Sequence, residues 1–141
     1  MPMTLHVELV VPDREIWSGS ARMVIAKTLE GDLGVLASHP PVLGILAEGS
    51  VVRILDPETT GDSGGAPAGG ELIAAVSSGF FSVADDQVSI LARNAELGSN
   101  VDTAAARAEL EASADASAAG GEESAEAGYA RARLRAAGEQ A

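Results

Sequence analysis

The chain has 141 residues, a formal net charge of −12, no cysteine and only 3% aromatic side chains. The absence of cysteine excludes disulfides, thiolate nucleophiles and cysteine-bound zinc, and the acidity disfavours nucleic acids and anionic lipid surfaces as partners. Hydrophobic residues still make up 46% of the sequence, which predicts a folded chain with an aliphatic core.

The first half of the chain is predicted to consist of short strands. Every second residue from 5 to 11 is aliphatic, which is typical of a half-buried strand, and Pro12 ends it. A break at residues 18–20 precedes a second strand over 22–28, in which Val24 and Ala26 share one face.

Turns and strands continue to alternate up to residue 97. A turn is predicted at 30–34, and the two prolines within 38–41 predict a stiff extended segment. The Gly-rich segment 56–70 is predicted to be a hairpin loop. Further strands are expected at 35–36, 42–47, 51–55, 71–76, 79–83 and 87–91. Eight or more short strands favour a β-sandwich or barrel.

The sequence changes character near residue 98, where an Ala-rich segment begins. We therefore expect a β-sandwich over 1–97 and a helical tail over 98–141. Ser99 with Asp102 resembles a capping box for the first helix, Gly120-Gly121 breaks it, and a second helix is expected from about 124 to 137. Neither helix buries much area, so the tail should dock on the sandwich, dock on a partner or stay mobile.

Catalytic residues are scarce. The two histidines, His6 and His39, are read as surface or loop residues, and neither a nucleophile elbow nor a phosphate-binding loop is present. Asp85 and Asp86 read as a solvated turn, while Phe80 and Phe81 are expected at the core and edge of the sandwich. No catalytic residue, metal site or cofactor is expected. Without a signal sequence or a long apolar run, the chain should be cytoplasmic unless a partner holds it at a membrane.

Residues 31–43 read Gly-Asp-Leu-Gly-Val-Leu-Ala-Ser-His-Pro-Pro-Val-Leu. This resembles the signature of ATP synthase epsilon subunits, Gly-Glu/Asp-Leu/Ile-Gly-Ile/Val-x-Pro-Gly-His-x-Pro-Leu-Leu. The segments 17–19, 78–83 and 88–92 also resemble the family in the right order, so that the resemblance covers 3–97. The tail is similar to the actinobacterial, mycobacterium-like branch.

The resemblance implies a flattened sandwich of two five-strand sheets followed by a helical hairpin. It also implies a non-catalytic central-stalk subunit that rotates with gamma and couples proton flow through the c-ring to the catalytic head. Such a subunit is held peripherally at the cytoplasmic face of the plasma membrane. Its C-terminal helices can extend along gamma and inhibit ATP hydrolysis.

The resemblance also assigns contact residues. Contact with the polar loops of the c-ring is implied for Gly31, Asp32 and Leu33. Contact with gamma is implied for Ser38, His39 and Pro40. The tail carries Arg131, Arg133 and Arg135, which either contact acidic surfaces of the alpha/beta head or form a solvated helix end that complements the helix dipole.

Two other functions remain as alternatives. A regulator that senses ATP through the tail would need the family motif Ile/Leu-Asp-x-x-Arg-Ala, but Ala105 stands at the arginine position and Arg107 lies on another face. A free-standing β-sandwich that binds carbohydrate would need stacking aromatics, which this chain largely lacks.

Overall fold

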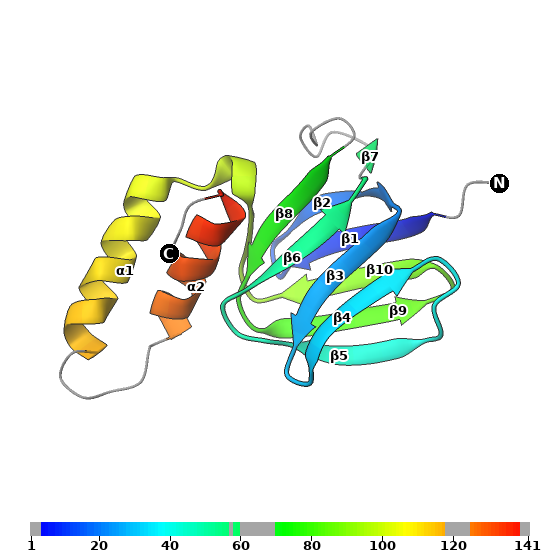
Figure 1. Ribbon diagram of the computed structural model, residues 1–141, viewed down its shortest axis with the longest axis horizontal. Helices are drawn as coiled ribbons and strands as arrows, with labels where there is room; N and C mark the ends of the chain where they lie inside the picture. The colour runs from blue at the N-terminus through cyan, green and yellow to red at the C-terminus, as the bar shows by residue number, and fades with distance from the viewer. Residues whose placement is uncertain (1–3, 57, 60–69, 118–124, 139–141) are drawn as a thin grey trace.

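The computed structural model describes residues 4–56, 58–59, 70–117 and 125–138 (Figure 1). Strands form a folded sheet, and two helices lie beside it. The strands are β1 (Leu5–Val11), β2 (Arg14–Ala21), β3 (Met23–Thr28), β4 (Gly31–Leu36), β5 (Val42–Leu46), β6 (Ser50–Leu55), β7 (Glu58–Thr59), β8 (Glu71–Val76), β9 (Gly79–Ala84), β10 (Gln87–Ala92) and β11 (Ala95–Leu97). The helices are the 3-10 helix η1 (Gly98–Asn100), α1 (Thr103–Ser117) and α2 (Ala125–Ala136).

The sheet consists of two halves that face each other, as the resemblance implied. One half contains β11, β8, β6, β3 and β4, and the other contains β5, β9, β10, β1 and β2, with β7 added at its edge. A single residue pair between β3 and β5, Thr28 with Leu46, joins them. The only parallel pairing among the described strands is that of β1 with β10.

Every second side chain along these strands points into the space between the two halves of the sheet, and together these side chains form the core. The four aliphatic residues on one face of β1 are buried, as predicted, and Val24 and Ala26 on one face of β3 are buried too. Trp17 and Phe81 are the largest fully buried side chains. The core is otherwise aliphatic and lies wholly within residues 5–97.

Two predicted turns are wrong. Residues 18–20 do not break the chain, because they continue β2 and pair with β1. Residues 31–34 are not a turn, because β4 begins at Gly31 and pairs with β3 over its whole length. In both cases, tertiary pairing overrides the local preference of Gly and Ser for turns. Most of the predicted loop 56–70 lies outside the described residues, although β7 falls inside it.

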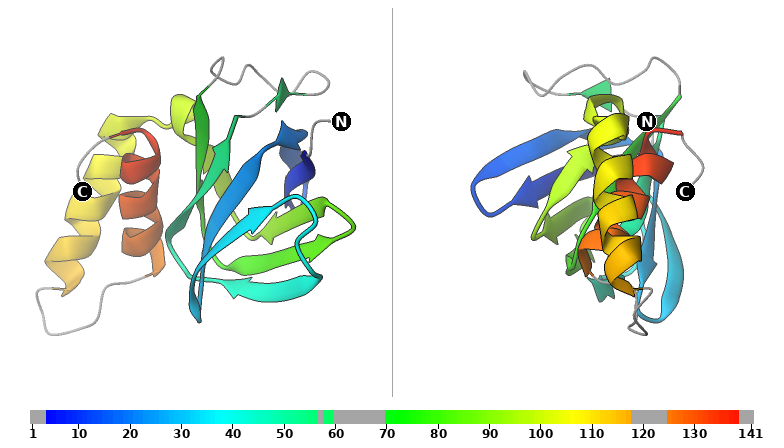
Figure 2. Two further views of the ribbon diagram at one scale, coloured as in Figure 1. Left: turned by 45° about the vertical axis from the view of Figure 1, so that its right-hand side comes forward. Right: turned by 90° about the vertical axis from the view of Figure 1, so that its left-hand side faces the viewer.

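The tail adds two layers to the sandwich: α2 packs on β6 and β8, and α1 packs on the other side of α2 (Figures 1 and 2). The first helix starts later than predicted, because the cap is Asp102, whose Oδ1 accepts the Ala105 N–H at 3.1 Å. The predicted break at Gly120-Gly121 lies outside the described residues. Neither α1 nor α2 is long and apolar enough to cross a bilayer.

Candidate functional site

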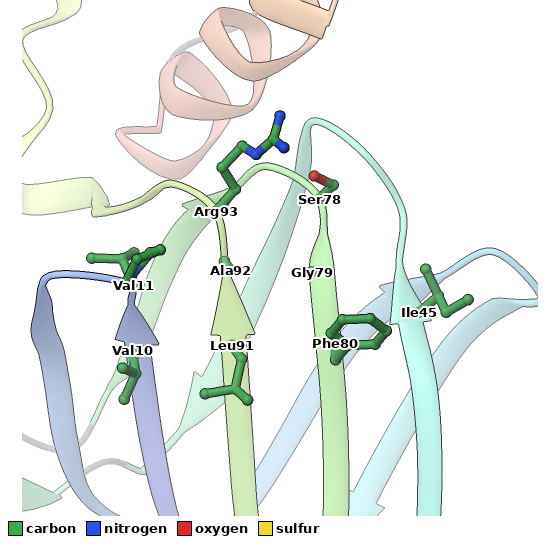
Figure 3. Close-up of a pocket in the computed structure, with 10 residues that line it drawn as sticks. Val10, Val11, Ile45, Ser78, Gly79, Phe80, Leu91, Ala92 and Arg93 are labelled. Atoms are coloured by element: carbon green, nitrogen blue, oxygen red, sulfur yellow. The ribbon is translucent and has the colours of Figure 1, made fainter.

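An apolar row crosses the outer face of the sheet half that the tail does not cover. The register sets Ile45 of β5 opposite Phe80 of β9, Phe80 opposite Leu91 of β10, and Leu91 opposite Val10 of β1. Residues directly opposite one another in a sheet point to the same side. The four side chains therefore form one continuous row, which we call the apolar row (Figure 3).

The apolar row is exposed. Phe80 is 53% exposed and Leu91 is 49% exposed, and Leu43, two residues before Ile45 on the same face of β5, is 72% exposed. The row lies in a shallow groove of about 610 Å³, with Arg93 extending along one side of it, beyond Leu91 and Ala92 (Figure 3). The groove is lined by Val10, Val11, Pro12, Ile45, Ser78, Gly79, Phe80, Leu91, Ala92 and Arg93.

The two outer faces of the sandwich differ in what covers them. On β6 and β8, Val51, Ile73 and Ala75 also point outward, but α2 packs on them. On β5, β9, β10 and β1, no described residue packs over the apolar row in the same way. A contiguous exposed apolar patch is typical of a surface that binds another protein. The arrangement is thus suited to docking, with an apolar centre and one cationic residue beside it.

Sequence reasoning missed the apolar row, although a signal for it was present. The strands over 42–46 and 87–92 and the Phe80-Phe81 pair place large apolar residues at consecutive positions. Because side chains alternate between faces, such runs predict that both faces of these strands are covered. Phe81 is core, as expected, but Phe80 lies in the middle of a sheet half and not at its edge.

The residues implied to contact the c-ring lie at the start of β4. Gly31 has a φ of 119°, a conformation that favours glycine, at the tight turn between β3 and β4. Asp32 is exposed and Leu33 is partly buried against the core. The turn itself is closed by Thr28, whose Oγ1 donates to the carbonyl oxygen of Gly31 at 2.8 Å. The carboxylate is thus presented to solvent from a well-defined hairpin.

The residues implied to contact gamma lie in the loop between β4 and β5. Ser38 has a φ of 69°, and its N–H donates to Oδ1 of Asp86, in the turn between β9 and β10, at 2.5 Å. Nδ1 of His39 lies 2.7 Å from the carbonyl oxygen of Pro40. The loop is therefore fixed both to itself and to a neighbouring turn. It leads directly into β5, which carries Leu43 and Ile45.

The structure does not bring these two groups together. They lie at the two ends of β4, roughly 16 Å apart at a rise of about 3.3 Å per residue. The turn between β3 and β4 adjoins the apolar row, because the N–H of Leu29 donates to the carbonyl oxygen of Ile45 at 3.0 Å, whereas the loop 38–40 lies at the other end of β5 (Figure 1). Two separate contacts, one at each end, are compatible with this geometry.

The three tail arginines have different surroundings. Arg135 is exposed, and Arg131 is partly buried. Arg133 is only 13% exposed and forms salt bridges with Glu96 of β11 and Glu109 of α1. In this conformation, Arg133 is therefore turned inward and does not form part of a solvated helix end.

The described residues contain no cluster of three or more His, Asp or Glu side chains that could hold a metal ion. Ala105 of α1 is exposed and offers no charge at the position where the ATP-binding motif has arginine.

Comparison with known proteins identifies relatives over nearly the whole length. Residues 4–98 match the family model "ATP synthase, Delta/Epsilon chain, beta-sandwich domain". The chain is 48% identical over 134 residues to the ATP synthase epsilon chain of Thermobifida fusca, covering 94% of this chain and 91% of that one. It is 45% identical over 107 residues to the epsilon chain of Streptomyces griseus, covering 75% and 77%.

Two further matches are informative about the fold and the tail. A chain in the structure of the Euglena gracilis mitochondrial ATP synthase, OSCP/F1/c-ring, superposes with a TM-score of 0.68 at 21% identity, covering 98% of this chain and 81% of that one. The epsilon chain of Frankia casuarinae is 47% identical over 95 residues, which are 67% of this chain and 99% of that one. The Frankia relative is thus too short for both a sandwich and a two-helix tail.

Proposed function

The chain belongs to the ATP synthase epsilon chain family, and from that premise we propose that it is a non-catalytic subunit of the central stalk of an F-type ATP synthase. In this role, it couples proton translocation through the c-ring to rotation of gamma. The epsilon chains of Thermobifida, Streptomyces, Rhodococcus and Frankia that it resembles are actinobacterial. The subunit would sit peripherally at the cytoplasmic face of the plasma membrane, held there by the complex.

The observation that carries the proposal is the uncovered apolar row. A subunit that transmits rotation must be fixed to the rotor, and burying Ile45, Phe80 and Leu91 would supply the free energy, at about 25 cal/mol per Å² of apolar surface. We propose gamma as the protein that covers this row. The loop at Ser38, His39 and Pro40 would extend the same contact, and its internal hydrogen bonds support this by lowering the cost of ordering on binding.

We propose that the hairpin at Gly31, Asp32 and Leu33 contacts the polar loops of the c-ring. The exposed carboxylate of Asp32 supports this contact, and the hairpin that carries it lies at the opposite end of β4 from the loop at Ser38. A polar contact of this kind would set orientation more than affinity.

We propose that residues 98–141 form a regulatory tail distinct from the sandwich over 1–97. Two observations support this division: the main core lies entirely within 5–97, and the short Frankia relative has no room for such a tail. When released from the sandwich, the tail would contact the alpha/beta head through Arg131, Arg133 and Arg135 and inhibit ATP hydrolysis.

A reconstitution experiment tests the proposed function. An ATP synthase complex from which the epsilon chain has been removed is titrated with the full chain and with residues 1–97, and binding and ATPase activity are measured. We expect both to bind and only the full chain to lower ATPase activity. If neither binds, the stalk assignment is wrong; if both bind and neither inhibits, docking stands and the inhibitory role of the tail does not.

The apolar row is tested separately with a pair of matched variants. We expect Leu91→Ser to weaken binding to a gamma-containing complex roughly tenfold to a hundredfold, because it places a hydroxyl at the centre of the buried contact. The control is Leu36→Ser, since Leu36 is a strand leucine of β4 with a similar exposure of 51%, outside the groove. Binding is measured by titration of a labelled chain. Equal losses for the two variants would contradict the assignment of this face.

A further inference from the structure

The contact between the tail and the sandwich is built mainly from small residues. Ala132 and Ala136 of α2 are buried against Ala75 of β8, with Val51, Ile73 and Tyr129 packed around them. The backbones approach closely at two places. A Cβ on Gly49 would lie 2.5 Å from the carbonyl carbon of Gly128, and one on Gly98 would lie 2.0 Å from the carbonyl oxygen of Ala136. Close packing of this kind excludes larger side chains from the contact.

The described part of α1 contributes few buried side chains, although α2 also buries Ala127, Ala130 and Leu134. Among the residues 103–112 of α1, whose side chains the structure describes, only Ala106 is fully buried. One alanine methyl group contributes on the order of 1 kcal/mol when it leaves water. A helix of this length is marginal by itself, so α1 depends on its contacts with α2.

Arg133 bridges both contacts. Its Nε donates to Oε1 of Glu96 on β11 at 3.0 Å, and its Nη1 donates to Oε2 of Glu109 on α1 at 3.1 Å. Its guanidinium carbon also lies 5.9 Å from the ring centre of Tyr129, one turn earlier on α2. One mostly buried side chain thus joins the sandwich, α1 and α2.

Arg133 lies between two carboxylates and forms an ion pair with each of them. Burial by itself lowers the pKa of Arg133, but the hydrogen bond to Glu96 and the charges of Glu96 and Glu109 outweigh it and raise the pKa. Without the arginine, Glu96 and Glu109 would still raise the pKa of the half-buried Tyr129, and the charge that lowers it would be gone. Removing the arginine therefore takes away the ion-pair partner of both carboxylates, of which Glu96 is the less exposed.

We infer that Arg133 is a latch that couples docking of α2 on the sandwich to packing of α1 on α2, so that both helices are released together. When the helices are released, the mostly buried guanidinium of Arg133 would become exposed at the same time. The consequence for inhibition in the complex rests on the proposed function. The latch itself is tested on the free full-length chain. The latch and the proposed function can therefore fail separately.

The chain carries its own reporter for this test. Tyr129 is its only tyrosine and lies in the contact. Burial and the carboxylate of Glu96 raise the pKa of Tyr129 above its ordinary value of 10.0, as does that of Glu109, whereas Arg133 lowers it. The two possible effects of Arg133→Met therefore have opposite signs. A released tail brings the pKa of Tyr129 down toward 10.0, while a tail that stays docked without the arginine shows a higher pKa than the wild type.

The experiment combines titration of tyrosinate absorbance with amide hydrogen exchange of the full chain. For Arg133→Met we expect the pKa of Tyr129 to fall and exchange to accelerate roughly tenfold in both α1 and α2. The control is Arg135→Met, which removes the same charge from an exposed position on the same helix. It should change neither the pKa of Tyr129 nor the exchange rates of the two helices. The fluorescence of Trp17, buried in the sandwich, should stay as in the wild type.

A second variant covers the case in which Arg133→Met does not fold. The double variant Glu96→Gln and Glu109→Gln keeps the arginine and weakens both of its ion pairs, so exchange should again accelerate in both helices. Protection retained in both helices, a rise in the pKa of Tyr129, or release of α1 alone would overturn the latch.

Discussion

Trp17→Ala should destabilise the sandwich by about 3 to 5 kcal/mol, a large share of the roughly 5 to 15 kcal/mol that holds a domain of this kind together. Trp17 is fully buried, lies opposite Leu9 of β1 and is the largest side chain in a core with few aromatics. The aliphatic residues around it are too short to fill the space it would leave. The variant should be partly unfolded at moderate temperature.

Denaturation by urea measures this loss. Circular dichroism must follow the transition, because Trp17 is the only tryptophan and its removal abolishes the fluorescence signal. Leu36→Ala is the control, since Leu36 is half exposed and should change the free energy of unfolding by no more than about 0.5 kcal/mol. A loss below 1 kcal/mol for Trp17→Ala would show that the core does not depend on this side chain.

Gly98→Ala should release the tail and leave the sandwich folded. Its backbone lies outside the left-handed region, so alanine is conformationally allowed, but the added Cβ would lie 2.0 Å from the carbonyl oxygen of Ala136 and 3.2 Å from that of Ile73. Both neighbours are backbone atoms. Overpacking of this kind costs about 3 kcal/mol, and the thinly packed α2 gives way more easily than β8 does.

Hydrogen exchange and Trp17 fluorescence distinguish the two parts. We expect α2 to lose protection in Gly98→Ala while the fluorescence is unchanged. Gly128→Ala is the matched control, and it should increase the protection of α2. A Cβ there would meet nothing closer than 3.9 Å, and alanine favours a helix over glycine by about 1 kcal/mol. If Gly98→Ala kept α2 protected, the close approach would not govern docking.

The strands that obey simple alternation could be predicted from the sequence, and the exceptions have a common cause. Residues 5–11 repeat with period two over a long enough stretch to define β1 and its buried face. Residues 18–20 and 31–34 contain glycine and were read as turns, but hydrogen bonds to β1 and β3 hold them in strands. Local preference is weak where a partner strand lies alongside, and the identity of that partner is not encoded nearby.

The candidate site could be predicted only in part for the same reason. The family resemblance assigned the exposed hairpin and the loop at 38–40 without reference to their surroundings. The hydrogen bond from Ser38 to Asp86 and the ion pairs of Arg133 join residues far apart in the sequence. The apolar row likewise becomes visible only once the register aligns four strands that are not consecutive in the chain. Spacing along the sequence carries no information about such contacts.

The parallel pairing of β1 with β10 has a consequence for how the chain acquires its fold. His6 pairs with Gln87, so the first strand to be synthesised can complete its pairing only after one of the last strands of the sandwich has been made. The β1–β2 hairpin can form at once, but one edge of β1 remains without its neighbour until β10 has left the ribosome. Closing so long a loop makes folding slow, and an open strand edge invites pairing with other chains. During synthesis the nascent chain should therefore depend on chaperones more than its small size suggests.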